Sequence, residues 1–210
     1  MILLKFMFIA VLVIVTHVRV WAACDDTNLV IDCAMSDSSA LASQSFPAEV
    51  LYLQRVVTVR YWGMDGKRHQ GQIVVHRDVV DDVRAIFNEL DSAQFPIQSV
   101  VPIVRYRWDD DASIARNNTS GFNYRTVDGS QRLSLHAYGL AIDLNPYLNP
   151  YVRIGRRQVR PYNPATPGTI VHGDIVHKAF TSRGWQWGGD WKNDKDYQHF
   201  DKRGLLNTTP

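Results

Sequence analysis

The stretch SLHAYGLAIDLNP, at residues 134–146, carries the most information about the fold of this chain. Its second half, AIDL at 141–144, has the apolar character of a strand inside a protein core. Alternate residues of a strand face the same side, so the Asp143 carboxylate is expected among apolar neighbours. A buried carboxylate without a partner is costly, and a divalent cation is one efficient partner.

Two histidines are placed to share such a cation with Asp143. His136 precedes a turn expected at Gly139 and can fold back toward the same side of the strand, and His199 lies in the segment DYQHF at 196–200. Zinc accepts imidazole nitrogen and carboxylate oxygen, and three protein ligands leave a fourth position for water, as in catalytic sites. We therefore expect one Zn²⁺ per chain on His136, Asp143 and His199.

Two further residues fit a hydrolytic reaction at this site. Asp196 lies three residues before the last ligand, where its carboxylate can take a proton from water and hand it to a leaving amine. Asp190 and Asp194 are its rivals for this role. Arg125 offers a rigid donor fork for a carbonyl oxygen or a substrate carboxylate, and a simple ion pair with Asp128 is the alternative.

The rest of the chain alternates short strands, turns and a few helices. Strands are expected at 56–61, 72–76, 99–105 and 141–144. Apolar residues repeat at helical spacing at 78–91, with Asp78 as N-cap, and at 175–180. Long polar loops are expected at 109–132 and 145–168. The fold class is therefore α+β, as a single domain with a central antiparallel sheet, flanking helices and long active-site loops.

The first 22 residues are expected to be a cleaved secretory signal peptide. Lys5 precedes an apolar run from Phe6 to Val15, and Val20-Trp21-Ala22 is typical of a cleavage site. The apolar run is short for a membrane span, although an uncleaved anchor is the alternative. Residues 23–48 are expected to be an irregular lead-in, and residues 49–210 the catalytic domain.

Export of the chain bears on its cysteines, charge and partners. Cys24 and Cys33 either form one disulfide, or Cys24 carries a lipid. Removing residues 1–22 takes away Lys5 and Arg19, so the formal charge falls from +2 to 0 and a nucleic-acid partner is not expected. The mature chain is expected to have no membrane span, to be a monomer, and to reside in the periplasm or outside the cell.

Several motifs, taken in order, resemble those of a known family. SLHAYGLAIDLNP, WGGDW at 187–191 and DYQHF are similar to the D-Ala-D-Ala carboxypeptidase and L-alanyl-D-glutamate endopeptidase family of zinc peptidases. That family shares its fold with lysostaphin-type enzymes and the hedgehog signalling domain. Similar sequence motifs occur upstream in DGKRHQGQIVVH, FPI and NNTSGFNYR, so the resemblance covers roughly residues 50–203.

The resemblance implies a role for each candidate residue. It implies zinc on the three ligands named above, and a catalytic carboxylate at Asp196, where many carboxypeptidase members have Glu. It implies that Arg125 positions the substrate, and it places Ser130 and Tyr138 near the site. Trp191, with Trp185 and Trp187, either lines the site as an aromatic wall or packs in the core.

The substrate that the resemblance implies is peptidoglycan or a muropeptide, cut at D-Ala-D-Ala or at L-Ala-D-Glu. Two other interpretations stay open. One is a non-catalytic, zinc-stabilised cell-wall-binding or signalling module of the same fold, and the other is a peptidase for other substrates, such as a dipeptidase or a toxin. The histidines outside the metal triad in the expected mature chain are interpreted as ordinary core or surface residues: 69, 76, 172 and 177.

Overall fold

The structure is a computed structural model, which describes residues 28–42, 46–153, 155 and 160–207. The expected signal peptide and Cys24 lie outside these residues. Helices and strands are both present and share one core, so the α+β class predicted from the sequence is confirmed. None of the helices among the described residues has the length and apolar character needed to span a bilayer.

Two long antiparallel strands form the base of the molecule. β2 (Gln54–Gly63) and β3 (Arg68–His76) pair along their whole length, and both are longer than the strands predicted at 56–61 and 72–76. β1 (Val30–Ile31) and β4 (Pro96–Ile97) add to the edges of this pair in parallel orientation. The sheet is therefore mixed rather than wholly antiparallel as predicted.

The inner face of this sheet is covered by one amphipathic helix. α3 (Val80–Ser92) buries the side chains that recur at helical spacing, namely Val83, Ile86, Phe87 and Leu90, as the periodicity predicts. The expected N-cap at Asp78 is wrong. A 3₁₀ turn, η2 (Arg77–Val79), comes first, and the ring of His76 accepts a hydrogen bond from the backbone N–H of Asp78.

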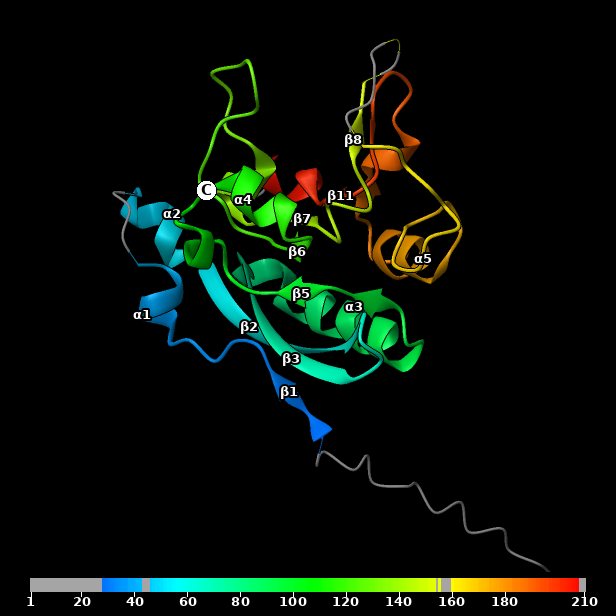
Figure 1. Cartoon of the computed structure of the whole chain (residues 1–210). Coiled ribbons are helices and arrows are strands. Elements are labelled where there is room, and N and C mark those ends of the chain that lie inside the picture. The colour runs from blue at the N-terminus through cyan, green and yellow to red at the C-terminus, as the bar shows by residue number, and fades with distance from the viewer. Residues whose placement is uncertain (1–27, 43–45, 154, 156–159, 208–210) are drawn as a thin grey trace, which may run out of the picture.

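A second, smaller sheet lies above the first in Figure 1. It consists of β7 (Ala141–Asp143), β11 (His199–Asp201) and β9 (Gln186–Trp187), all antiparallel, with β11 in the centre. α5 (Ile175–Thr181) packs beside it, and the rings of Phe180 and Phe200 stack with centroids 3.9 Å apart. These side chains join those of α3 and β2 in one hydrophobic core.

The strand expected at 99–105 is much shorter in the structure. β5 (Ser99–Val100) pairs in parallel with β6 (Asn118–Thr119) and then stops. Pro102 has no N–H to donate to a ladder, and it becomes the N-cap of the 3₁₀ helix η3 (Ile103–Tyr106).

Short elements complete the chain. They are α1 (Asp37–Ala40), α2 (Ala48–Tyr52), α4 (Asp110–Ala115), η4 (Leu135–Tyr138), β8 (Tyr151–Val152), η5 (Gly188–Asp190), β10 (Lys195–Asp196) and η6 (Arg203–Asn207). Three of them, α1, α4 and β8, lie within the segments expected to be irregular. The described parts of the long loops predicted from the sequence therefore contain a short helix and two-residue strands.

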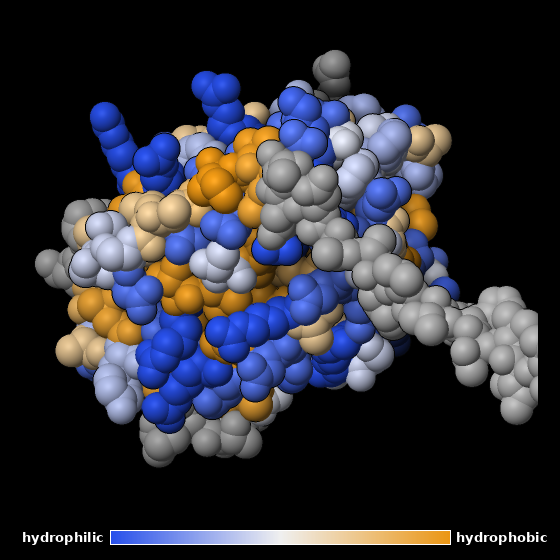
Figure 2. All heavy atoms as spheres, turned by 90° about the horizontal axis from the view of Figure 1, so that it is seen from below, coloured by the Kyte–Doolittle hydropathy of each residue, from blue (hydrophilic) through white to orange (hydrophobic). Residues whose placement is uncertain are grey.

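The segment expected to be an irregular lead-in contains regular structure in its described part. β1, α1 and the first residue of α2 fall within residues 23–48. Phe46 packs edge-on against Trp108 at 4.7 Å, and both contact a small apolar cluster around Val74 and Phe122 on the outer face of β3. Figure 2 views the molecule from below, the side on which β1 lies in Figure 1. Apolar side chains are exposed there among hydrophilic ones.

Candidate metal centre

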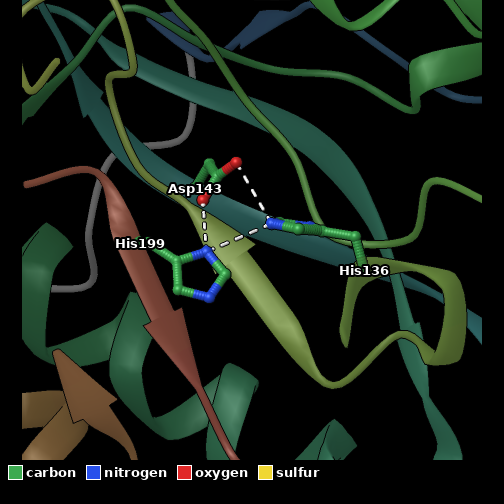
Figure 3. Close-up of side chains that lie close together, drawn as sticks. All are labelled: His136, Asp143 and His199. Atoms are coloured by element: carbon green, nitrogen blue, oxygen red, sulfur yellow. Dashed lines mark hydrogen bonds and ion pairs between the residues drawn. The ribbon is translucent and has the colours of Figure 1, made fainter. Parts of the chain in front are cut away.

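Three buried side chains converge where β7, β11 and η4 meet. Nε2 of His136 lies 3.1 Å from one carboxylate oxygen of Asp143, and Nδ1 of His199 lies 2.9 Å from the other. The two imidazole nitrogens are 3.3 Å apart. Figure 3 shows that all three side chains point toward one another. The structure thus brings together the three residues that the sequence predicts as metal ligands.

Local structure explains this convergence. In the antiparallel pairing of β7 with β11, His199 stands directly opposite Asp143, so their side chains share one face. His136 reaches that face because η4 ends at Gly139, whose φ of 69° turns the chain back into β7. A side chain at Gly139 would also meet the backbone N of His76 at 2.5 Å, so glycine is required there for space as well.

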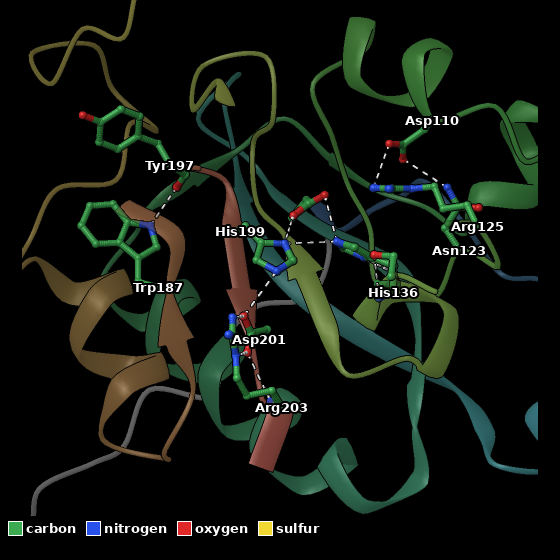
Figure 4. A network of polar contacts seen from close by, with 12 residues as sticks. Asp110, Asn123, Arg125, His136, Trp187, Tyr197, His199, Asp201 and Arg203 are labelled. Carbon is green, nitrogen blue, oxygen red and sulfur yellow. Dashed lines mark hydrogen bonds and ion pairs between the residues drawn. The ribbon is translucent and has the colours of Figure 1, made fainter. Parts of the chain in front are cut away.

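The remaining ring nitrogens are held by second partners. Nδ1 of His136 donates to the carbonyl oxygen of Gly121 at 2.6 Å, which leaves Nε2 with its lone pair toward the cluster. Nε2 of His199 lies 3.6 Å from a carboxylate oxygen of Asp201, which is itself buried and paired with Arg203 at 2.6 Å. Figure 4 shows this chain of contacts.

This arrangement fits a cation. When the outer nitrogen of each ring carries the proton, two lone pairs and a carboxylate face one another in a buried space, which is unfavourable unless positive charge lies among them. Burial alone would raise the pKa of Asp143, but the two imidazoles outweigh it and hold that pKa well below its usual range. Burial would lower the pKa of His199, and the Asp143 and Asp201 carboxylates outweigh this and raise it. The cluster therefore attracts positive charge strongly, whether a proton or a metal ion.

Asp196 lies at the edge of this cluster. It belongs to β10, whose backbone pairs with β8, and Gly188 packs closely against it. Burial raises the pKa of Asp196 to about 6, the nearby His199 lowers it, and the negative charge of Asp143 raises it. A carboxylate with a pKa near neutrality is suited to accept and release a proton.

The two rival aspartates are engaged elsewhere. Asp194 accepts a hydrogen bond from the hydroxyl of Tyr151 at 2.5 Å. Asp190 contacts His172 and His177. Asp196 is among the largest influences on the pKa of His199, and neither rival is. Of the three, Asp196 is the one placed to act at the cluster.

Arg125 is paired with an acid that the sequence analysis did not name. Nη2 of Arg125 lies 3.0 Å from Asp110 rather than pairing with Asp128, and Asp110 also accepts from the Asn123 amide at 3.1 Å. The backbone N–H of Asn123 donates to the carbonyl of His136. In Figure 4 the pair lies beyond His136, on the side away from His199. Burial raises the pKa of Asp110, and Arg125 opposes this rise.

The other predicted site residues lie at different depths. The ring of Trp191 is 5.7 Å from that of His199. Tyr138 is half-buried against the core, and Ser130 is exposed in a loop where it accepts from the backbone N–H of Arg132. Trp185 and Trp187 are core residues, so only Trp191 among the three tryptophans lies beside the cluster.

Sequence reasoning missed two residues that support the site. Asp201 follows His199 by two positions in one strand, so alternation alone indicates that the two share a face. Asp110 carries no comparable signal, because it lies in a polar loop and comes near Arg125 only through the fold. The cluster of His172, His177 and Asp190 was also missed, since isolated histidines are ordinarily structural.

Comparison with known proteins bears on the region that carries the cluster. A family model described as D-alanyl-D-alanine carboxypeptidase matches residues 128–202, which include all three predicted ligands and Asp196 but not Arg125. No solved structure matches the chain. The resemblance predicted from the sequence motifs is confirmed over this region. Over residues 128–202 the chain is therefore similar to D-alanyl-D-alanine carboxypeptidases.

Proposed function

We propose that the protein is a zinc-dependent peptidase that hydrolyses amide bonds in peptidoglycan stem peptides. The observation that carries this proposal is the buried convergence of His136, Asp143 and His199 beside Asp196. The family match supports the peptidase class, as a carboxypeptidase of the D-Ala-D-Ala type or an endopeptidase of the L-Ala-D-Glu type. When bound, Zn²⁺ supplies a Lewis acid that polarises the scissile carbonyl and lowers the pKa of water.

Asp196 moves the proton in this reaction. Its carboxylate accepts a proton from the attacking water as the new C–O bond forms at the carbonyl carbon. It then delivers that proton to the leaving nitrogen as the C–N bond breaks, so one water is consumed and a carboxylate and an amine are released. The raised pKa of about 6 makes both steps feasible near neutral pH.

Arg125 and Trp191 position the substrate in this proposal. Arg125 is held by Asp110, and its side chain remains 29% exposed. A partly exposed guanidinium suits a substrate carbonyl or terminal carboxylate. Trp191 offers an apolar ring face beside His199. We further propose that the protein acts as an exported monomer, in the periplasm or outside the cell.

The test is cleavage of purified muropeptides, followed by mass spectrometry. The zinc-loaded protein is expected to cut them, chelation to abolish cutting, and added Zn²⁺ to restore it. Loss of the terminal D-Ala identifies a carboxypeptidase, and cleavage after L-Ala identifies an endopeptidase. Full activity in the metal-free protein, or muropeptide binding without any cleavage by the zinc-loaded protein, would overturn the proposal.

A matched pair of variants tests the role of Asp196. Asp196→Asn should keep its zinc and lose roughly 10²–10⁴-fold in kcat, the range for a general acid–base group. Asp194→Asn, two residues earlier in the same segment, should stay close to wild type. Equal losses in both variants would show that Asp196 has no special role.

A further inference from the structure

A second group of metal-ligating side chains lies outside the candidate metal centre. Nδ1 of His172 is 2.8 Å from one carboxylate oxygen of Asp190, and Nε2 of His177 is 3.2 Å from the other. The two imidazole rings lie 4.3 Å apart, centroid to centroid. His172 precedes α5, His177 lies within α5, and Asp190 ends η5, so three separate segments meet at this point.

This group repeats the donor set of the candidate metal centre. In both places one aspartate directs a different oxygen to each of two imidazole nitrogens, at distances of 2.9 and 3.1 Å in the first and 2.8 and 3.2 Å in the second. In each, the ligand atoms all lie within 4.8 Å of one another. His69 offers a contrast, because it too lies between two carboxylates but without a second imidazole.

We infer that His172, His177 and Asp190 form a second binding site for a divalent transition-metal ion such as Zn²⁺. Two imidazoles and one carboxylate favour late first-row metals over Mg²⁺ and Ca²⁺, which prefer oxygen ligands. His172 and Asp190 are 72% and 46% exposed, so an ion enters directly from solvent and water completes its coordination. His177 is only 12% exposed and anchors the site from the α5 side.

The second site binds its ion more weakly than the first. In the first centre the carbonyl of Gly121 accepts from His136 and fixes which ring nitrogen faces the metal. Nδ1 of His177 is buried and has no hydrogen-bond partner among the described residues. Loss of such an outer partner ordinarily lowers metal affinity by about 10–100-fold.

An ion at this site ties η5 to α5, and η5 is in contact with the first centre. Gly188, the first residue of η5, packs against Asp196, and Trp191, the residue after η5, lies beside His199. The second ion therefore steadies η5, which packs against Asp196 and leads into Trp191. Its role is structural support rather than chemistry.

The experiment is a zinc titration of the purified full chain by equilibrium dialysis with elemental analysis. Wild-type protein is expected to bind two ions per chain in two steps, one tight and one at least tenfold weaker. The double variant His172→Ala, Asp190→Asn should keep only the tight step, and His69→Ala, the control, should keep both. Co²⁺ in place of Zn²⁺ should give an added visible absorption band with the second equivalent, which the double variant lacks.

The two metal proposals fail separately in this titration. His199→Ala should lose the tight step and keep the weak one. A wild-type plateau of one ion per chain, or an unchanged plateau of two in the double variant, would overturn the second site. If a variant does not fold, release of zinc from the wild type by a chromophoric chelator still tests whether a second ion is bound. A single release step of one ion per chain would exclude it.

Discussion

At the scale of single residues, the candidate metal centre depends on which nitrogen of each imidazole carries the proton. Gly121 fixes this for His136 through its backbone carbonyl, and the Asp201 carboxylate, 3.6 Å from Nε2 of His199, favours a proton on that nitrogen. These partners use opposite ring nitrogens, so the ring of His136 presents Nε2 and that of His199 presents Nδ1. In the proposed metal centre, two histidines with different tautomers share one ion.

The pKa of Asp196 sets the pH dependence of the proposed reaction. A general base works only when ionised, and burial raises this pKa to about 6, so protonation at lower pH removes the base. A bound cation favours the ionised form, which places the midpoint of the acid limb at or below about pH 6. We expect kcat to fall about tenfold per pH unit below that midpoint.

The measurement is kcat against pH at saturating zinc, with metal content checked at each pH. The residual activity of Asp196→Asn should lack this acid limb. If kcat falls at low pH in the same way in the variant and the wild type, that pH dependence belongs to another group.

The sequence indicated the ligand residues more reliably than their supporting partners. His136, Asp143 and His199 are predictable because a carboxylate in an apolar strand requires a partner and imidazoles suit the same cation. The Arg125 partner was not predictable in this way. Asp110 and Asp128 are both acids in a polar loop, and only the folded path of that loop selects Asp110.

At the scale of elements, the turn between η4 and β7 controls the metal centre. Gly139 has φ of 69°, and a Cβ there would meet Gln54 Oε1 at 2.2 Å and His76 N at 2.5 Å. Gly129 has φ of 71°, but a Cβ there would meet nothing within 4 Å. The two glycines therefore separate the cost of the backbone angle from the cost of the clash.

We expect Gly139→Ala to destabilise the fold clearly more than Gly129→Ala. The left-handed angle costs each variant about 1 kcal/mol, and the clash with backbone atoms of β3 adds to it only at Gly139. Urea unfolding of both variants measures the difference. Equal losses of unfolding free energy would mean that the η4–β7 turn relaxes without cost.

Element prediction worked where one physical effect dominates. β2, β3, α3 and α5 follow from apolar periodicity, because each buries one face against the core. The segment 99–105 is equally rich in β-branched residues, yet Pro102 ends the strand early. The described part of 23–48 shows no periodicity. Its few apolar residues are irregularly spaced along the chain and pack individually against the small apolar cluster around Val74 and Phe122.

At the scale of the whole molecule, the candidate metal ligands join η4 to the neighbouring strands β7 and β11 of the smaller sheet. Removing the ion leaves buried acceptors facing one another, and it also removes the free energy of binding. That free energy is about 4 kcal/mol when zinc is at a thousand times its dissociation constant. For a domain of this size, this corresponds to a fall in Tm of roughly 8–16 °C.

Calorimetry of the zinc-loaded protein with and without chelator measures this fall. His199→Ala, which lacks one ligand of the tight site, should lose most of its response to the chelator. A chelator-treated wild type that melts at the same temperature as the loaded protein would show that the cluster is stable without a cation.

The order of the strands along the chain has a consequence for synthesis. β11 lies at the centre of the three-stranded sheet but is the last strand in sequence, after β7 and β9. A growing chain therefore presents β7 and β9 as unpaired edges, with Asp143 lacking its neighbour, until residues 199–201 have been made. The smaller sheet and the candidate metal centre are thus completed in the same late event.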